Sequence, residues 1–129
     1  MPYELMRRAF ELECQGDLDA AISLLTRGID SLDLSERHQE LSVLTNTLSI
    51  LCERTGRHEL GIEYLRRCLG TYPDDLASWH HLAQLLMKIG RVQDARTAVD
   101  KLRRACNSST HRFQREWQEL LERLEQSVG

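Results

Sequence analysis

Histidine is the side chain in this sequence whose chemistry is easiest to test from spacing, because it binds metals and carries protons near neutral pH. Five histidines are present. A helix offers two ligands to one ion when they stand three or four residues apart. His80 and His81 are adjacent, about 100° apart around a helix, and Ala77 and Leu85 occupy the positions four residues from His81. The others fall near expected helix starts or turns: His38, His58 and His111. We expect no metal and no cofactor.

Cysteine is the second metal-binding and redox-active residue type. The four cysteines stand singly, with no Cys-x-x-Cys pair: Cys14, Cys52, Cys68 and Cys106. Isolated cysteines in a helical chain are more often small buried apolar residues than halves of a disulfide. We therefore interpret all four as structural and expect a reducing compartment.

Motifs of nucleophilic and phosphate chemistry are also missing. The sequence has no Gly-x-Ser-x-Gly turn, no Gly-rich phosphate loop and no Walker lysine. The acidic residues fall on the expected solvent faces of amphipathic helices. We expect a chain that is not an enzyme, with no catalytic residue and no small-molecule substrate.

A basic stretch offers a thin argument for nucleic acid. Residues 91–115 carry a net charge of +5, and a basic face neutralises phosphates. However, the isoelectric point is about 5.9, and no aromatic stacking platform accompanies the arginines. Nucleic acid is therefore the last of our alternatives. The basic residues are Arg91, Arg96, Lys101, Arg103, Arg104, Arg112 and Arg115.

Composition indicates the elements that carry these side chains. The 129 residues suit one domain, and the shortage of aromatic residues and prolines favours helices over a β-sandwich or barrel. No apolar run approaches the length that spans a bilayer, and the N-terminus lacks the pattern of a secretory signal. We expect a cytoplasmic protein without a membrane partner.

Three glycines mark an internal repeat. Gly16, Gly56 and Gly90 each end one helical apolar pattern and precede another. Residues seven before each glycine are small, as are those five after it, whereas those four before and nine after are mostly larger and apolar. In that order they are Ala9, Ser49, Ala83; Ala21, Gly61, Ala95; Leu12, Cys52, Leu86; and Leu25, Leu65, Val99. The pattern predicts units of two helices, A and B, joined by a turn at a glycine of positive φ. Neither helix buries its face alone, so the units must stack.

The pattern resembles the tetratricopeptide repeat, a helix–turn–helix unit of 34 residues. The third unit matches best, with Trp79, Leu82 and Ala83 before Gly90 and with Ala95 and Val99 after it. The second unit departs from it, with Thr45 in the place of Trp79. The resemblance implies an all-α fold, a right-handed α–α superhelix (TPR-like solenoid) of about seven antiparallel helices.

The resulting organisation is one TPR-like domain over residues 1–129. Repeat 1 covers about 2–34, an inserted segment about 35–41, repeat 2 about 42–75, repeat 3 about 76–108, and a capping helix about 109–127. Ser35 is a plausible N-cap and Glu36 suits the positive helix end. The second A helix should therefore be about one and a half turns longer than the others. One apolar stripe follows the last helix, at the place of a fourth A helix: Phe113, Trp117, Leu120, Leu121 and Leu124.

The family's A helices line a concave groove that binds extended peptides or helices of partners. Helix geometry places thirteen residues on that side here: Tyr3, Met6, Phe10, Glu13, Val43, Asn46, Ile50, Glu53, Ala77, His80, Gln84, Met87 and Lys88. Exposed aromatic residues and methionine suit apolar anchors of a partner, and Asn46 is suited to bond a partner backbone. Tyr3, Met6 and Phe10 equally suit self-packing or a dimer contact.

One subtype of the family holds a C-terminal carboxylate of its chaperone partner with a clamp of Lys, Asn and Arg. The matching places here are Met6, Phe10, Thr47, Ala77 and His81, and none carries the required residue. That recognition mode is therefore not expected.

The leading hypothesis is a non-enzymatic adaptor or scaffold that binds a peptide or helix of another protein in the groove. A small client-specific chaperone, cytosolic or of the secretion type, is the first alternative. The second is a self-assembling homodimer that uses Tyr3, Met6 and Phe10.

Overall fold

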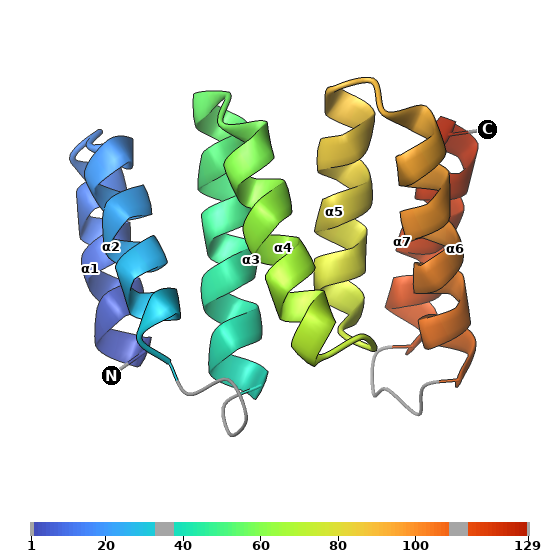
Figure 1. Cartoon of the computed structure of the whole chain (residues 1–129), viewed down its shortest axis with the longest axis horizontal. Helices are drawn as coiled ribbons and strands as arrows, with labels where there is room; N and C mark the ends of the chain where they lie inside the picture. The colour runs from blue at the N-terminus through green and yellow to red at the C-terminus, as the bar shows by residue number, and fades with distance from the viewer. Residues whose placement is uncertain (1, 33–37, 109–113, 129) are drawn as a thin grey trace.

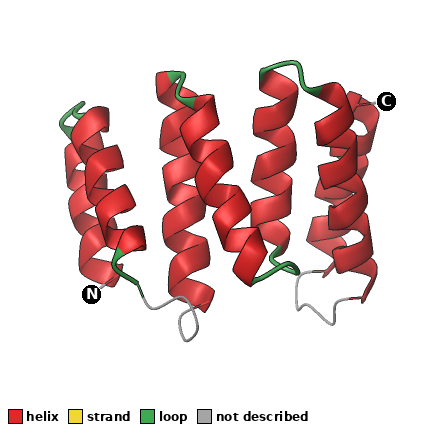
Figure 2. Ribbon diagram, viewed as in Figure 1, coloured by secondary structure: helices red, strands yellow, loops and turns green. Residues whose placement is uncertain are grey.

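The fold is described here from a computed structural model, which covers residues 2–32, 38–108 and 114–128, without the side chains of residues 2, 3, 108 and 114. These residues form α-helices joined by short turns, and none of them forms a strand (Figure 2). The helices are α1 (Pro2–Cys14), α2 (Leu18–Asp30), α3 (His38–Thr55), α4 (His58–Thr71), α5 (Leu76–Lys88), α6 (Val92–Ser108) and α7 (Gln114–Val128). The prediction of an all-α solenoid of about seven helices is confirmed.

The three marker glycines make the turns inside the helix pairs. Gly16, Gly56 and Gly90 have φ values of +81°, +78° and +80°, a region that side chains with a Cβ rarely adopt. In the first turn the N–H of Asp17 donates to the carbonyl of Leu12 at 2.9 Å, and the other two turns repeat this bond. This is the Schellman arrangement, which satisfies the last carbonyls of each A helix.

The helix pairs stack side by side in chain order, so that the two chain ends lie at opposite ends of the long axis (Figure 1). The A helices α1, α3 and α5 each pack against their own B helix and against the next A helix. Helix α7 packs against α6 and α5, which is the position of a fourth A helix. The structure thus supports the predicted place of the C-terminal helix, although Phe113 lies outside the described residues.

The second A helix is longer than its neighbours. Helix α3 has 18 residues, whereas α1 and α5 have 13 each. The difference is about one and a half turns, as predicted from the inserted segment. The proposed cap at Ser35 and Glu36 lies outside the described residues.

The predicted seams form the core. The small residues seven before and five after the glycines are buried in all three units. At Gly61 the approach is so close that an added Cβ would lie 2.9 Å from a methyl group of Leu85. The apolar core divides into two clusters, one over α1 to α4 and one over α4 to α7. The buried polar residues of the described chain lie on α3 and α5, where the two clusters meet: Thr45, Asn46, Ser49 and Ser78.

Three cysteines follow the prediction and one does not. Cys52, Cys68 and Cys106 are buried, and all four are free thiols. Cys14 is exposed, because it stands two residues before its glycine. That position faces solvent in the other units too, where it is held by Arg54 and Lys88.

Candidate functional site

One face of the molecule, called here the A-helix face, is built by α1, α3, α5 and α7 and carries three hollows. The N-terminal hollow lies between α1 and α3 and has a volume of about 250 Å³. Its lining is mainly apolar: Met6, Ala9, Phe10, Glu13, Thr47, Ile50 and Leu51. Phe10 is 63% exposed and Ile50 is 47% exposed, so large apolar surface remains open to a partner.

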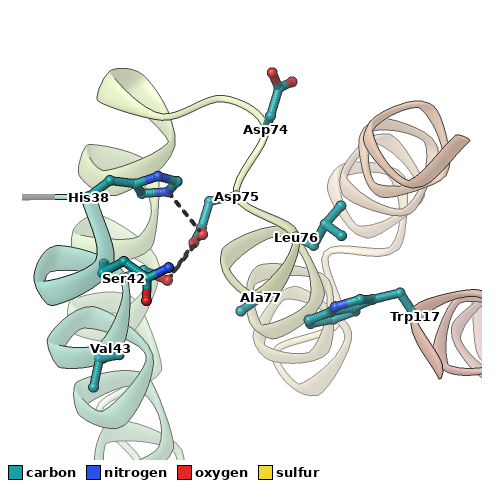
Figure 3. Close-up of a pocket in the computed structure, with 9 residues that line it drawn as sticks. His38, Ser42, Val43, Asp74, Asp75, Leu76, Ala77 and Trp117 are labelled. Carbon is teal, nitrogen blue, oxygen red and sulfur yellow. Dashed lines mark hydrogen bonds and ion pairs between the residues drawn. The ribbon is translucent and has the colours of Figure 1, made fainter. Parts of the chain in front are cut away.

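The Asp75 hollow lies where α3, the start of α5 and α7 meet, and has a volume of about 280 Å³. Figure 3 shows His38, Ser42 and Val43 on one side, Asp74 and Asp75 in the segment before α5, and Trp117 of α7 on the other side. Leu76, Ala77 and Gln39 complete the lining. The hollow therefore combines carboxylates with apolar surface and an indole ring.

Asp75 is held in one orientation by its neighbours. Its side chain is only 11% exposed. Its carboxylate accepts hydrogen bonds from the Ser42 hydroxyl at 3.0 and 3.1 Å and from the Ser78 hydroxyl, and it lies 3.2 Å from Nε2 of His38. The His38 ring stacks on Tyr72 at 4.0 Å between centroids. We expected the acidic residues on solvent faces, and Asp75 is the exception, because it precedes α5 and points into the α3–α5 seam.

The C-terminal hollow lies at the other end of α5 and has a volume of about 380 Å³. It is lined by Glu53 of α3, by Gln84, Met87 and Lys88 of α5, and by Leu124 and Ser127 of α7. Helix α7 therefore contributes to the same face as the A helices of the repeats.

The structure brings most of the predicted groove residues together on this face. Ten of the thirteen line one of the three hollows: Met6, Phe10, Glu13, Val43, Ile50, Glu53, Ala77, Gln84, Met87 and Lys88. The side chain of Tyr3 is outside the described part. The remaining two, Asn46 and His80, lie on the same helical stripes but are engaged within the chain. That a partner binds to these thirteen residues remains a prediction, because the fold does not test it.

Asn46 is 8% exposed, and its amide is committed to neighbours. Its Nδ2 donates to the Ser42 carbonyl at 2.7 Å and lies 3.3 Å from the Ser78 hydroxyl, while its Oδ1 lies 2.6 Å from Nδ1 of His81. The oxygen accepts from the ring N–H, which fixes the tautomer of His81. The predicted bond from Asn46 to a partner backbone would have to replace these contacts.

His80 is half-buried between two rings. Its centroid lies 5.9 Å from that of Trp117 and 5.4 Å from that of His81, both in edge-on arrangements. Burial, with a smaller contribution from the charge of His81, lowers the pKa of His80 to about 4. Burial also lowers the pKa of His81. Both rings are therefore neutral near pH 7 and act as aromatic and hydrogen-bonding surface.

Ion pairs cross the A-helix face at equivalent places. Glu13 of α1 lies 3.3 Å from Arg54 of α3, and Glu53 of α3 lies 3.3 Å from Lys88 of α5. In both cases the acid stands three residues before its glycine and the base two residues before the next one. The groove charges predicted at Glu13, Glu53 and Lys88 are thus partly neutralised within the chain.

Sequence reasoning missed several residues of this face. Trp117, Leu124 and Ser127 were assigned to a cap rather than to the groove, although their spacing of seven and ten residues already puts them on one helical stripe. His38 and Asp75 had no signal of their own, because the contact between them spans 37 residues.

The other chemical candidates find no support in the geometry. Within the described ranges, no group of three or more His, Cys, Asp or Glu side chains could hold a metal ion. The basic stretch is largely paired: Arg91 lies 3.0 Å from Glu59, and Arg103 contacts both Asp100 and Glu125. These pairs reduce the positive charge available to phosphates.

No helix in the described part of the chain has the length and apolarity needed to cross a bilayer.

The stacked helix pairs and the hollowed face along their A helices define a helical-repeat protein. The sequence model of the tetratricopeptide repeat matches residues 54–124, which is more than half of the chain. The chain therefore belongs to the tetratricopeptide repeat family.

A solved structure shares the fold of this chain. The first TPR of Spaghetti (RPAP3), bound to the HSP90 peptide SRMEEVD, is similar to this chain with a TM-score of 0.69. The similarity covers 98% of this chain and 94% of the solved chain, at 12% sequence identity. At that identity the likeness concerns the fold.

Proposed function

We propose that this protein is a non-enzymatic, cytoplasmic interaction module that binds a peptide or helical segment of another protein along the A-helix face. The observation that carries the proposal is the open apolar surface at the N-terminal hollow. Phe10, Ile50 and Val43 are three of the four large hydrophobic side chains exposed in the described part of the chain, and all three lie on this face.

Covering these exposed side chains with a partner would be favourable. Burying apolar surface contributes about 25 cal/mol per Å², and side chains of this size lie inside the core at other seams of this chain. The Spaghetti domain, which shares the fold, is described as bound to an HSP90 peptide. A bound segment is therefore one use that this fold supports.

The mode of binding should differ from a carboxylate clamp. The places that the resemblance assigns to the clamp hold Met6, Phe10, Thr47, Ala77 and His81. None of these provides a cation near pH 7, since the pKa of His81 is lowered by burial. We propose that apolar anchoring replaces the clamp.

The test is selection of a random-peptide display library on the full chain. Peptides enriched on the unchanged protein should bind Phe10→Asp/Ile50→Asp at least about tenfold more weakly, because a charge replaces a desolvated apolar contact. The matched control is Val92→Asp, since Val92 is 43% exposed at the start of α6 and lines none of the three hollows. Circular dichroism checks that each variant keeps its helices.

Two outcomes would overturn the proposal. One is the absence of enriched peptides, and the other is equal binding to the double variant and to the unchanged chain. If sedimentation shows a dimer that Phe10→Asp/Ile50→Asp dissociates, and no peptide binds, the face serves self-assembly instead. The client-specific chaperone would appear as one stoichiometric partner that needs the same two residues.

A further inference from the structure

The charges of the A-helix face indicate which kind of segment it accepts. Among the described residues that line the three hollows, four carry a carboxylate and one carries an ammonium group: Glu13, Glu53, Asp74, Asp75 and Lys88. The ion pairs with Arg54 and Lys88 compensate the two glutamates. The described lining of the Asp75 hollow contains two carboxylates and no lysine or arginine, and the ring of His38 lies 3.2 Å from Asp75 within it.

The Asp75 hollow has the lining that an alkyl chain with a cationic end requires. Val43, Leu76 and Ala77 give it apolar surface, and Trp117 brings an indole ring. The carboxylate of Asp75 is oriented by Ser42 and Ser78, while Asp74 is exposed at the rim with its carboxylate directed away from that of Asp75 (Figure 3). Arginine and lysine side chains combine an apolar stem with a charged end, and both are attracted by aromatic faces.

We propose that the A-helix face selects a partner segment that inserts an arginine or lysine side chain into the Asp75 hollow while an apolar residue rests on Phe10 and Ile50. This inference rests on the proposed function and adds the sign of the partner's charge. It is opposite to the acidic character of the HSP90 peptide SRMEEVD in the Spaghetti structure.

The spacing of the two contacts sets the spacing in the partner. Val43 lines the Asp75 hollow and Ile50 lines the N-terminal hollow, and both lie on α3. Seven residues of helix correspond to about 10 Å. An extended segment covers that distance in about three residues. The basic and apolar anchors should therefore be about three positions apart in an extended partner, or about two turns apart in a helical one.

The experiment uses the same random-peptide library on the full chain and reads the composition of the enriched pool. Compared with the starting pool, arginine and lysine should rise at least about twofold relative to aspartate and glutamate. Replacing the basic residue of an enriched peptide by glutamate should weaken its binding about tenfold, and the preference should shrink as salt increases.

Variants locate the preference. Asp74→Asn removes an exposed charge and Asp75→Asn keeps the size of the bonded group, so each should reduce the preference for basic residues while the apolar residue stays enriched. Asp94→Asn is the matched control, because Asp94 lies in the first turn of α6 and lines none of the three hollows. Because Asp75 accepts hydrogen bonds from two hydroxyls, circular dichroism must show that Asp75→Asn is folded. If that variant is not folded, the test relies on Asp74→Asn alone.

Each outcome decides one of the two proposals. Enriched peptides that need Phe10 and Ile50 but have no bias to basic residues, or have an acidic bias, overturn this inference and leave the proposed function standing. A basic bias that survives both Asp74→Asn and Asp75→Asn also overturns it. Absence of enrichment, or enrichment that ignores Phe10 and Ile50, overturns the proposed function and this inference with it.

Discussion

The molecule has two junctions between helix pairs, one between the first and second pairs and one between the second and third. Equivalent positions meet at both junctions, but the side chains there are mainly apolar at the first and polar at the second. Counted from the glycines, four positions of the first junction hold Met6, Leu41, Leu44 and Thr47, and the same positions of the second hold Asn46, Asp75, Ser78 and His81. Leu41 and Leu44 are buried in apolar contact. Ser78 is buried too, but it bonds to Asp75 and Asn46.

The comparison shows that the side chains between stacked helix pairs must be complementary but need not be apolar. At the first junction the contacts between leucine side chains are non-directional, so a small shift of one helix along the other breaks no specific bond. At the second junction a shift would break the hydrogen bonds that cross it, which are those of Asn46 with Ser78 and His81 and that of Ser42 with Asp75. A buried polar group left unsatisfied costs about 1–3 kcal/mol. The polar seam therefore fixes the register of α5 against α3 more tightly than leucine contacts fix α3 against α1.

The two junctions also differ in where they carry an aromatic side chain on the side formed by the B helices. At the first junction Tyr64 of α4 covers the seam, and its hydroxyl lies 3.1 Å from a carboxylate oxygen of Asp30. The equivalent residue of α6 is Ala98, while Trp79 replaces Thr45 on the A helix. The Trp79 indole N–H donates to the Pro73 carbonyl at 2.7 Å. A hollow of about 320 Å³ remains beside Trp79 and Ala98, because an aromatic ring on the A helix does not fill the space that Tyr64 fills.

The largest expected effect comes from breaking the apolar junction. Leu44→Ala removes a side chain that is fully buried and should lower the free energy of unfolding by about 2–5 kcal/mol, from lost burial and the cavity left behind. The equivalent change Ser78→Ala should cost less, about 1–3 kcal/mol, because it removes one partner from Asn46 and from Asp75. Urea denaturation followed by circular dichroism measures both, and an equal or greater loss for Ser78→Ala would contradict the comparison.

The sequence predicted the small and apolar seam positions around the marker glycines well, and the residues specific to each junction poorly. Ala21 and Leu25 belong to positions that stay small or apolar at a fixed distance from each marker glycine, and a single sequence shows such periodicity. The position of Leu44 holds Ser78 in the third unit and carries no such signal. Asp75, Ser78 and Asn46 carry no periodic signal, because each is a residue type that usually faces solvent. Their burial depends on contacts across 32 or 33 residues of chain. The stripe of groove residues was predicted for the same reason as the core, whereas the part taken by Trp117 was not, since it depends on how α7 packs.

An intermediate loss of stability should appear on acidification, and it should come from His80 and His81 at the second junction. The pKa of His80 is lowered to about 4 and that of His81 is also lowered. The unfolded chain, where histidine titrates near its ordinary pKa of 6.5, therefore binds protons first. Stability should fall as pH falls from about 6.5 towards 4, and it should be fully present above that window.

The control isolates these rings from the carboxylates, which also titrate in acid. His80→Gln should flatten the fall of the melting temperature between pH 6.5 and 4.5. The matched control is His58→Gln, which replaces a histidine at the start of α4, outside the second junction. The first junction has Thr47 at the place of His81, so it adds no such dependence. Parallel pH curves for all three proteins would show that the acid sensitivity lies elsewhere.

The smallest effect should come from the ion pairs that the two junctions share. The side chains of Arg54 and Lys88 are 51% and 58% exposed, and exposed pairs contribute about 0–1 kcal/mol. Arg54→Ala and Lys88→Ala should therefore lower the free energy of unfolding by less than about 1 kcal/mol each, by similar amounts, and less in high salt. The ion pairs are the same at both junctions, whereas the buried side chains differ. Equal small losses of stability in the two variants would therefore show that the junctions differ in their buried contacts. A loss at Lys88 comparable with that of Ser78→Ala would instead assign the second junction's stability to its surface charges.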